Sequence, residues 1–350
     1  MKMTGTMPTK STGNSRWLVQ SYFAFRVSFT EVAENIMSVA DWVDWERGDF
    51  VFHMPYRPYD GVLYIGSMMN MDVARYYRYM WWTNRHVYYG VTEGPPIISP
   101  FNLEALRRMT VITPSQYVRM ELEGIGVRVA GVIPHCIDID RIRSIPRNNE
   151  WRKMFGDKFV ALYVAHRHLR KGFRELCEAW MSSRAGRDPG VILVLHTSRE
   201  PNRTSGEDYI IPEEGNIVVT DNVLKLDRQS LYALYRSADL YIHGGLAEGF
   251  GIPVVEAIAA GVPVLTVDAP PMSETNRVRE ARVKVMEQRV VVDRGLVTYR
   301  LNIPDPVEYS ELIDKMVYDR EFRTEVMERQ QEYVGEYSLS AYKRFKEFID

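Results

Sequence analysis

Two glutamates frame a glycine-rich segment in the second half of the chain. Glu248 precedes the glycines at 249 and 251, and Glu256 follows Glu248 by eight positions. The glycines allow a ligand to approach the backbone, and a helix starting near Pro253 would direct its free amide groups toward that ligand. A helix N-terminus attracts phosphate, whereas carboxylates accept hydrogen bonds from sugar hydroxyls. The combination favours a ligand that carries both groups, as a nucleotide-sugar does.

A basic turn lies earlier in the same half. Arg167, Arg170 and Lys171 follow the apolar run Phe159–Ala165, which we expect to form a buried strand. Cations fixed beyond the end of such a strand could stabilise negative charge on a departing diphosphate. A solvated surface turn is the alternative interpretation of these residues.

The run EGFGIPVVEAIAAGVPV, from Glu248 to Val264, resembles the signature of retaining glycosyltransferases of family four (glycosyl transferases group 1). The resemblance is strongest over residues 159–275. It implies an α/β fold of GT-B architecture, in which two Rossmann-like domains with parallel sheets face each other across a cleft. By the same resemblance, Arg167 and Lys171 match the arginine and lysine that bind the donor diphosphate, and Arg170 competes for this role.

The resemblance also implies roles for the other residues of the second half. Glu248 would bind sugar hydroxyls and Glu256 would hold the ribose diol. Asn222 and Val223 lie in a turn that resembles the family's base-contacting turn, although a plain connection between a strand and a helix is the alternative. The expected donor-binding residues are Gly249, Phe250, Gly251, Ile252, Glu256, Asn222 and Val223.

The N-terminal half departs from the family pattern. Many members have a glycine-rich loop after the first strand, whereas here Ser21–Arg26 contains no glycine, and Arg26 would have to substitute for that loop electrostatically. Many members also place a histidine near the reacting sugar, but this chain has Glu93 after the matching strand. We expect Glu93 to lie in the cleft and to contact the sugar or the acceptor, with a structural turn residue as the alternative.

Alternating β-rich and helical segments indicate how these residues are positioned. At roughly 100–200 residues per domain, a chain of 350 residues predicts about two domains. We expect a flexible tail over 1–15, an N-terminal acceptor-side domain over 16–140 and a C-terminal donor-side domain over 150–335. A C-terminal helix over 336–350 would close the fold. Closure about residues 134–150 would exclude water from the reacting groups.

The composition excludes several classes of protein. The 44 Lys and Arg nearly balance the 46 Asp and Glu, so no overall basic field favours nucleic acid as a partner. The two cysteines, Cys136 and Cys177, suggest a reducing compartment and are too few for a metal cluster. Without a signal peptide or a long apolar segment, we expect a cytoplasmic protein, with peripheral membrane association as an addition.

Two clusters of residues resemble metal sites. Asp138 and Asp140 fall in the expected hinge, and His166 and His168 have no third ligand close in sequence. We therefore expect no metal and no cofactor.

The aromatic run Tyr76–Trp82 allows two interpretations. At helical spacing, Tyr77, Met80 and Trp81 would form a core face. The other aromatics, with the nearby arginines, would suit a membrane surface or an acceptor sugar.

These observations predict a metal-independent, retaining, hexosyltransferase-like enzyme. It would move a sugar from a UDP- or GDP-linked donor to a hydroxyl on a glycan, a lipid-linked molecule or a protein. The alternatives are a nucleotide-sugar epimerase or hydrolase of the same fold and a non-catalytic protein that binds sugar-nucleotides or glycans.

Overall fold

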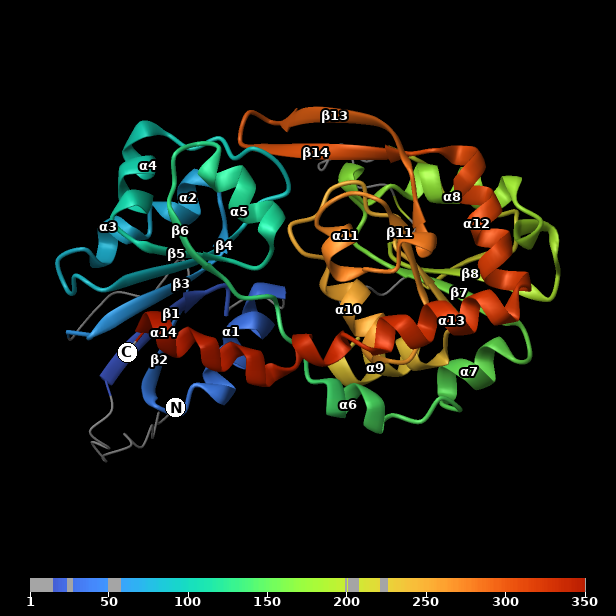
Figure 1. The fold of residues 1–350 in the computed structure, drawn as a ribbon, viewed down its shortest axis with the longest axis horizontal. Helices are drawn as coiled ribbons and strands as arrows, with labels where there is room; N and C mark the ends of the chain where they lie inside the picture. The colour runs from blue at the N-terminus through green and yellow to red at the C-terminus, as the bar shows by residue number, and fades with distance from the viewer. Residues whose placement is uncertain are drawn as a thin grey trace, which may run out of the picture.

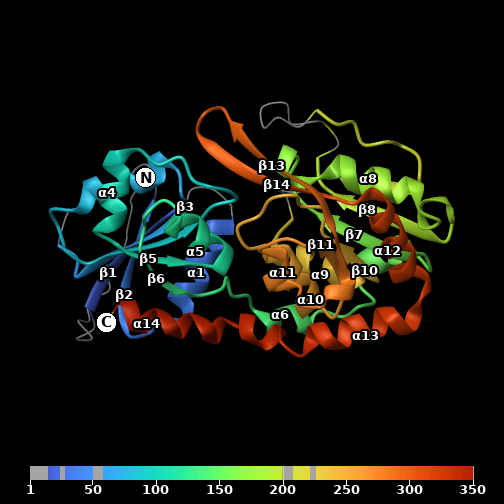
Figure 2. The ribbon, with the colours of Figure 1, turned by 45° about the horizontal axis from the view of Figure 1, so that its top comes forward.

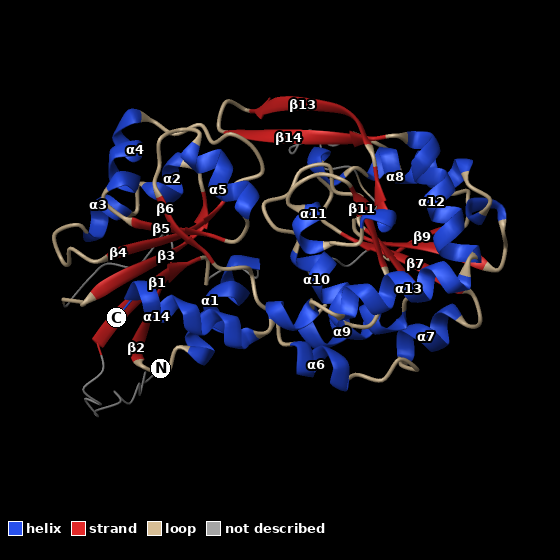
Figure 3. Ribbon diagram, viewed as in Figure 1, coloured by secondary structure: helices blue, strands red, loops and turns tan. Residues whose placement is uncertain are grey.

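The computed structural model describes residues 15–23, 28–49, 58–198, 200, 208–220 and 226–349. Within them the chain forms two α/β lobes, each built on a six-stranded sheet, so the expected α/β fold class is confirmed (Figure 1). Every strand pair in the two large sheets is parallel. Figure 3 shows the strands in the interior of each lobe and the helices around them.

The N-terminal sheet has the strand order β2-β1-β3-β4-β5-β6. Its central strands are buried on both faces and are nearly continuous runs of apolar and aromatic residues, as expected for a parallel sheet covered by helices. The strands are β1 (Ser15–Ser21), β2 (Val43–Asp49), β3 (Gly61–Ser67), β4 (His86–Val91), β5 (Thr110–Thr113) and β6 (Val129–Val132).

The helices of this lobe begin at recognisable capping residues. Ser99 and Ser115 each accept a hydrogen bond from a backbone amide in the first turn of α4 and α5. The helices are α1 (Ser28–Val39), α2 (Asn70–Val73), α3 (Tyr76–Tyr79), α4 (Pro100–Arg107) and α5 (Gln116–Glu123).

The aromatic run Tyr76–Trp82 and the residues before it form two short helices, α2 and α3, rather than one continuous helix. Arg75 lies between them, and its guanidinium is buried and donates to three backbone carbonyls, including those of Gln20 and Ile65. This tertiary bonding overrides the local helical pattern. The expectation that Trp81 packs in the core was wrong, because its side chain is 84% exposed.

The C-terminal sheet has the order β12-β11-β10-β7-β8-β9. It is preceded by the helices α6 (Ile139–Ser144) and α7 (Glu150–Phe155). The strands are β7 (Phe159–Val164), β8 (Val191–His196), β9 (Ile217–Val219), β10 (Leu240–Ile242), β11 (Val264–Val267) and β12 (Arg282–Val283), and the helices between them are α8 (Phe173–Ser182), α9 (Arg228–Ser237), α10 (Ile252–Ala259) and α11 (Met272–Thr275).

An antiparallel hairpin that the sequence analysis did not anticipate connects the lobes. It consists of β13 (Val285–Asp293) and β14 (Val297–Pro304), and it extends from the C-terminal lobe toward the N-terminal lobe (Figures 1 and 2). The amide of Arg300 donates to the carbonyl of Glu93 at 2.9 Å, and its guanidinium donates to Glu121 at 2.8 Å. The hairpin therefore covers one edge of the region between the sheets.

The end of the chain returns to the N-terminal lobe. After α12 (Pro306–Tyr318) and α13 (Arg320–Gln331), it crosses back and ends in a 3-10 segment and α14 (Lys346–Ile349), as both ribbon views show (Figure 2). Tyr342, Phe345 and Ile349 are fully buried in the core beside Trp17. At the crossing, the amide of Ile137 donates to the carbonyl of Tyr337 at 2.9 Å, so the two connections between the lobes lie side by side.

None of the helices within the described ranges has the length and apolar character needed to cross a membrane.

Candidate active site

The glycine-rich segment connects β10 to α10 at the carboxyl end of the C-terminal sheet. Gly251 caps the helix with φ of +89°, a left-handed conformation that favours glycine. Gly249 faces the other lobe: a Cβ atom here would lie 2.9 Å from the carbonyl oxygen of Thr92. The two glycines thus serve different purposes, one for the turn and one for close approach of the lobes.

Glu248 lies at the centre of a buried ion-pair cluster. Its carboxylate accepts from Lys171 Nζ through one oxygen and from Arg170 Nη1 at 3.1 Å through the other. A short 3-10 turn, Leu169–Lys171, places both cations on this side of β7. His243, the residue after β10, lies close to the same carboxylate, with its Nε2 atom 3.4 Å from Glu248 Oε1.

The charges in this cluster decide its protonation. Burial alone would raise the pKa of Glu248, but Lys171 and Arg170 outweigh burial and hold that pKa well below its usual range. Burial, reinforced by Arg170, lowers the pKa of Lys171, while Glu248 acts in the opposite direction. Burial likewise acts to lower the pKa of Arg170, but Glu93 and Glu248 overcome it and raise that pKa. Glu248 is therefore an ionised acceptor and a poor base.

Glu93 approaches the same cluster from the other lobe. It follows β4, and its carboxylate lies 3.2 Å from Arg170 Nη2, so one guanidinium joins carboxylates of both lobes. The Arg170 guanidinium also lies 5.9 Å from the centre of the Tyr299 ring, on the hairpin strand β14. The structure thus brings Glu93, Lys171 and Glu248 together around Arg170.

Arg167 lies elsewhere. Its guanidinium is buried, stacks over the Phe173 ring at 4.9 Å and donates to the backbone carbonyl of Tyr209. Of the arginines in this turn, Arg170 is the one in the charged cluster, and only the turn geometry distinguishes it from Arg167.

Glu256 forms a second charged group in the second turn of α10. Its side chain is 2% exposed, and Arg228 Nη2 on α9 lies 3.1 Å from its carboxylate. Burial raises the pKa of Glu256, and Arg228 opposes that shift. Arg228 also contacts Glu31 on α1 of the N-terminal lobe, and Tyr232 donates to Glu31 at 3.3 Å. No sequence pattern indicates this pairing, because its members lie far apart in the chain.

Some of the remaining residues with predicted roles lie within the described ranges and others lie outside them. Phe250 is buried, with its ring near His135 at 5.1 Å and near Tyr337 at 5.9 Å, and Ile252 is the first residue of α10. Arg26, Asn222 and Val223, for which the sequence predicted roles, lie outside the described residues.

The two residues that imitate a metal motif have local roles. Asp138 caps α6 by accepting from the amide of Arg141 at 3.0 Å, and Asp140 lies in the first turn of that helix. Across the part of the chain that the structure describes, no three His, Cys, Asp or Glu side chains are grouped as metal ligands.

Solved structures with a similar fold include a glycosyltransferase from Rickettsia africae and several sugar-phosphate synthases. Anabaena HepE in complex with UDP and glucose aligns with a TM-score of 0.69 and 15% identity over 95% of this chain and 99% of that one. Sucrose-phosphate synthase from Thermosynechococcus elongatus aligns with a TM-score of 0.68 and 13% identity over 95% and 98%. The UDP-forming α,α-trehalose-phosphate synthase from Burkholderia vietnamiensis aligns with a TM-score of 0.67 and 10% identity over 96% and 99%. These similarities confirm the GT-B fold with its two Rossmann-like domains.

The sequence itself carries a family match. No curated protein matches the chain significantly. The family model described as glycosyl transferases group 1 matches residues 146–332, which is more than half of the chain and includes both charged groups of the C-terminal lobe. With the glycine-rich turn, the Glu248 cluster and the fold all in agreement with this match, the chain belongs to the glycosyl transferases group 1 family.

Proposed function

We propose that this glycosyltransferase transfers a hexosyl group from a nucleoside-diphosphate sugar to a hydroxyl acceptor, with retention of anomeric configuration and without a metal. The observation that carries the proposal is the buried Glu248, held between Lys171 and Arg170 at the N-terminus of α10. HepE, which has the same fold, is seen with UDP and glucose, and this supports a UDP-sugar as the first donor to test.

Donor binding would rearrange the charged cluster. In the structure, Lys171 pairs with Glu248, and Arg170 pairs with Glu248 and Glu93. A diphosphate between Lys171 and Arg170 would take over these ion pairs, because phosphate forms strong charge-assisted hydrogen bonds. Glu248 would then accept from a hydroxyl of the sugar, as the sequence pattern predicts.

Leaving-group stabilisation would be the main catalytic effect. Negative charge develops on the diphosphate as the glycosidic bond breaks, and fixed cations in a buried site stabilise it without reorganisation. Arg170 joins Lys171 in this role. Arg167 instead stabilises the turn by stacking on Phe173, the first residue of α8.

The protonation of the site supports retention. Glu248 has a depressed pKa, so it is poorly suited to remove the acceptor proton. A diphosphate oxygen on the same face of the sugar would accept that proton, and attack from this face leaves the anomeric configuration unchanged.

The ribose of the donor would bind beside Glu256. This carboxylate is buried but borders Arg228 and, through Arg228, Glu31 of the other lobe. Hydroxyls of the ribose would compete with Arg228 for the same acceptor.

The acceptor side carries an exposed aromatic surface. Met71, Trp81, Trp82 and Phe101 are 61%, 84%, 38% and 66% exposed, on or beside α2, α3 and α4, which group at one end of the N-terminal lobe (Figure 1). The Tyr77 ring stacks on Phe101 at 4.1 Å and holds part of this surface in place. Exposed aromatic clusters of this kind suit the interfacial region of a bilayer, so a lipid-linked acceptor fits this end of the molecule.

A thermal-shift panel of UDP, GDP, ADP and their glucose conjugates tests the donor. Saturating UDP or GDP should raise Tm, and the absence of a shift with every nucleotide diphosphate would overturn the donor assignment. Anomeric NMR of the product then tests retention, because an inverted product contradicts the same-face mechanism.

The same reagents test the alternatives. Turnover of the donor without an acceptor would favour the hydrolase or epimerase. Donor stabilisation with no product across a broad acceptor panel would favour a non-catalytic binding protein. Flotation with liposomes, with the double variant Trp81→Ser/Trp82→Ser for comparison, tests the membrane surface; equal flotation of both proteins would exclude it.

A further inference from the structure

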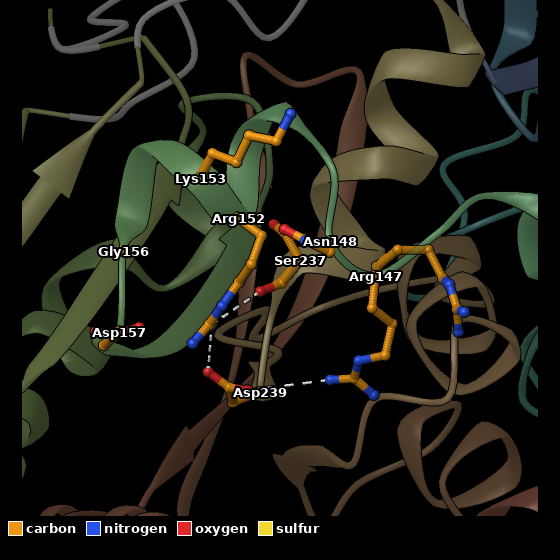
Figure 4. A pocket seen from close by; sticks show the side chains of 9 residues that line it. Arg147, Asn148, Arg152, Lys153, Gly156, Asp157, Ser237 and Asp239 are labelled. Carbon is orange, nitrogen blue, oxygen red and sulfur yellow. Dashed lines mark hydrogen bonds and ion pairs between the residues drawn. The ribbon is translucent and has the colours of Figure 1, made fainter.

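A second polar pocket opens on the C-terminal lobe, away from the charged cluster. It has a volume of about 430 Å³, within the range of small-molecule sites. Its wall comes from the connection between the lobes, from α7 and from the end of α9 (Figure 4). The lining residues are Arg147, Asn148, Arg152, Lys153, Gly156, Asp157, Arg236, Ser237 and Asp239.

The pocket lies at the opposite edge of the sheet from the donor site. Asp157 lies two residues before β7 and Asp239 directly before β10, whereas the basic turn and the glycine-rich segment follow these same strands. Strands of a parallel sheet place their amino ends on one edge and their carboxyl ends on the other. A ligand here would therefore occupy a site separate from the Glu248 cluster.

Positive charge dominates the lining. Four cations line the pocket, Arg147, Arg152, Lys153 and Arg236, against the two carboxylates of Asp157 and Asp239. Asp239 is the shared partner, with Arg152 Nη1 at 2.8 Å and Arg147 Nη2 at 4.0 Å. Figure 4 shows both guanidiniums directed toward Asp239, while Lys153 extends away from them.

Arg236 and Arg147 bind mainly backbone carbonyls. Arg236 donates to Ile145 at 2.8 Å and to Ala260 at 2.7 Å, and Arg147 donates to Ala238 at 3.0 Å and to Gly261 at 3.4 Å. These carbonyls lie mostly at helix ends, so part of the role of both arginines is structural. Each guanidinium has five N–H donors, and these bonds account for two of them.

The positive charges also repel one another. Burial lowers the pKa of Arg236, and the neighbouring charges of Arg147 and Arg143 lower it further. An anion that accepted hydrogen bonds from the remaining N–H groups would relieve the repulsion between these arginines.

We propose that this pocket binds the phosphate group of a small soluble phosphomonoester, with Arg147 and Arg236 as its principal donors. Arginine binds phosphate through paired hydrogen bonds, and the polar lining matches a small, charged ligand better than an apolar one. The site does not depend on the identity of the glycosyl donor.

Titration with glycerol 3-phosphate and with inorganic phosphate tests the proposal. Binding is followed by Tm at constant ionic strength, with Lys171→Ala as the background protein so that phosphate bound at the donor site does not contribute. A saturable rise in Tm with glycerol 3-phosphate is expected. A stronger response to inorganic phosphate would mean that the free ion is the ligand and would overturn the phosphomonoester assignment, as would an equal shift with chloride.

Two variants separate a specific site from diffuse charge. Arg147→Gln should weaken binding about tenfold, equivalent to about 1.4 kcal/mol. Lys153→Gln removes the same charge from the same rim, but Lys153 Nζ is held by Glu150 at 2.6 Å, so this variant should bind within about twofold of its parent. Equal weakening by both variants would overturn the proposal.

Hydrogen exchange on the unsubstituted protein provides a test that does not depend on the folding of a variant. With UDP saturating the donor site, glycerol 3-phosphate should protect peptides covering 147–157 and 236–239. Protection confined to 166–172 would instead assign the phosphate to the donor cluster.

Discussion

Replacing Lys171 with alanine removes one of the two cations that we place on the donor diphosphate. The ammonium contacts Glu248, and the Lys171 side chain is 14% exposed. Arg170 still pairs with the same carboxylate at 3.1 Å in the variant, so Glu248 is not left as an unpaired buried charge. We therefore expect the variant to fold.

The loss in donor affinity follows from the interaction removed. A hydrogen bond to a charged group contributes about 1.5–3 kcal/mol, so the Kd for UDP should rise by roughly 10- to 150-fold. Uridine lacks the diphosphate and does not need this cation, so its Kd should stay within about twofold, which is less than 0.5 kcal/mol.

Isothermal titration of UDP and uridine measures both quantities. Lys158→Ala is a matched control, since Lys158 is an exposed lysine of the same lobe that precedes β7. Equal weakening of UDP and uridine by Lys171→Ala would refute the placement of the diphosphate. So would unchanged UDP affinity in a folded variant.

Three further predictions concern the cleft, the core and metal dependence. Glu93→Gln removes a charge that pairs with Arg170 but lies on the acceptor side. The kcat should therefore fall, while the Kd for UDP should change less than about threefold. Initial rates measure the first quantity and titration with UDP the second. Burial lowers the pKa of His135 to about 3, so below about pH 6.5 the unfolded chain binds a proton that the folded chain does not. The free energy of unfolding should therefore fall as the pH drops from 6.5 toward 3, and His135→Gln should reduce this slope in urea titrations at pH 5 and 7.5; an unchanged slope would contradict the buried neutral imidazole. Activity should survive EDTA, and a strict manganese requirement would argue for Asp138 and Asp140 as ligands despite their position on α6.

Local sequence patterns were sufficient to predict the α/β class of the fold and the glycine-rich turn. Buried parallel strands are continuous apolar runs, and the step from β10 to α10 has glycines where the backbone needs them. Glu248 and Lys171 could be chosen from the sequence because the segments around them resemble the motifs of the family.

Features that depend on distant residues could not be predicted in this way. Arg167 and Arg170 are equivalent in a linear sequence, and the short 3-10 turn decides which one faces Glu248. The contacts of Arg228 with Glu256 and with Glu31 join residues far apart in the chain. Strand β13 is exposed along most of its length, so it lacks the apolar alternation that marks a half-buried strand.

The two connections between the lobes have a mechanical consequence. A single connecting segment would let the lobes bend and twist about any direction, whereas here the outgoing and returning segments are hydrogen-bonded to each other through Ile137 and Tyr337. Two segments joined in this way favour rotation of the lobes about one axis, which passes through both segments, and they resist rotation about other axes. The returning segment is also anchored in the N-terminal core by Tyr342 and Phe345. Rotation about this axis would separate Glu93 from Arg170, and the reverse rotation would restore the same ion pair.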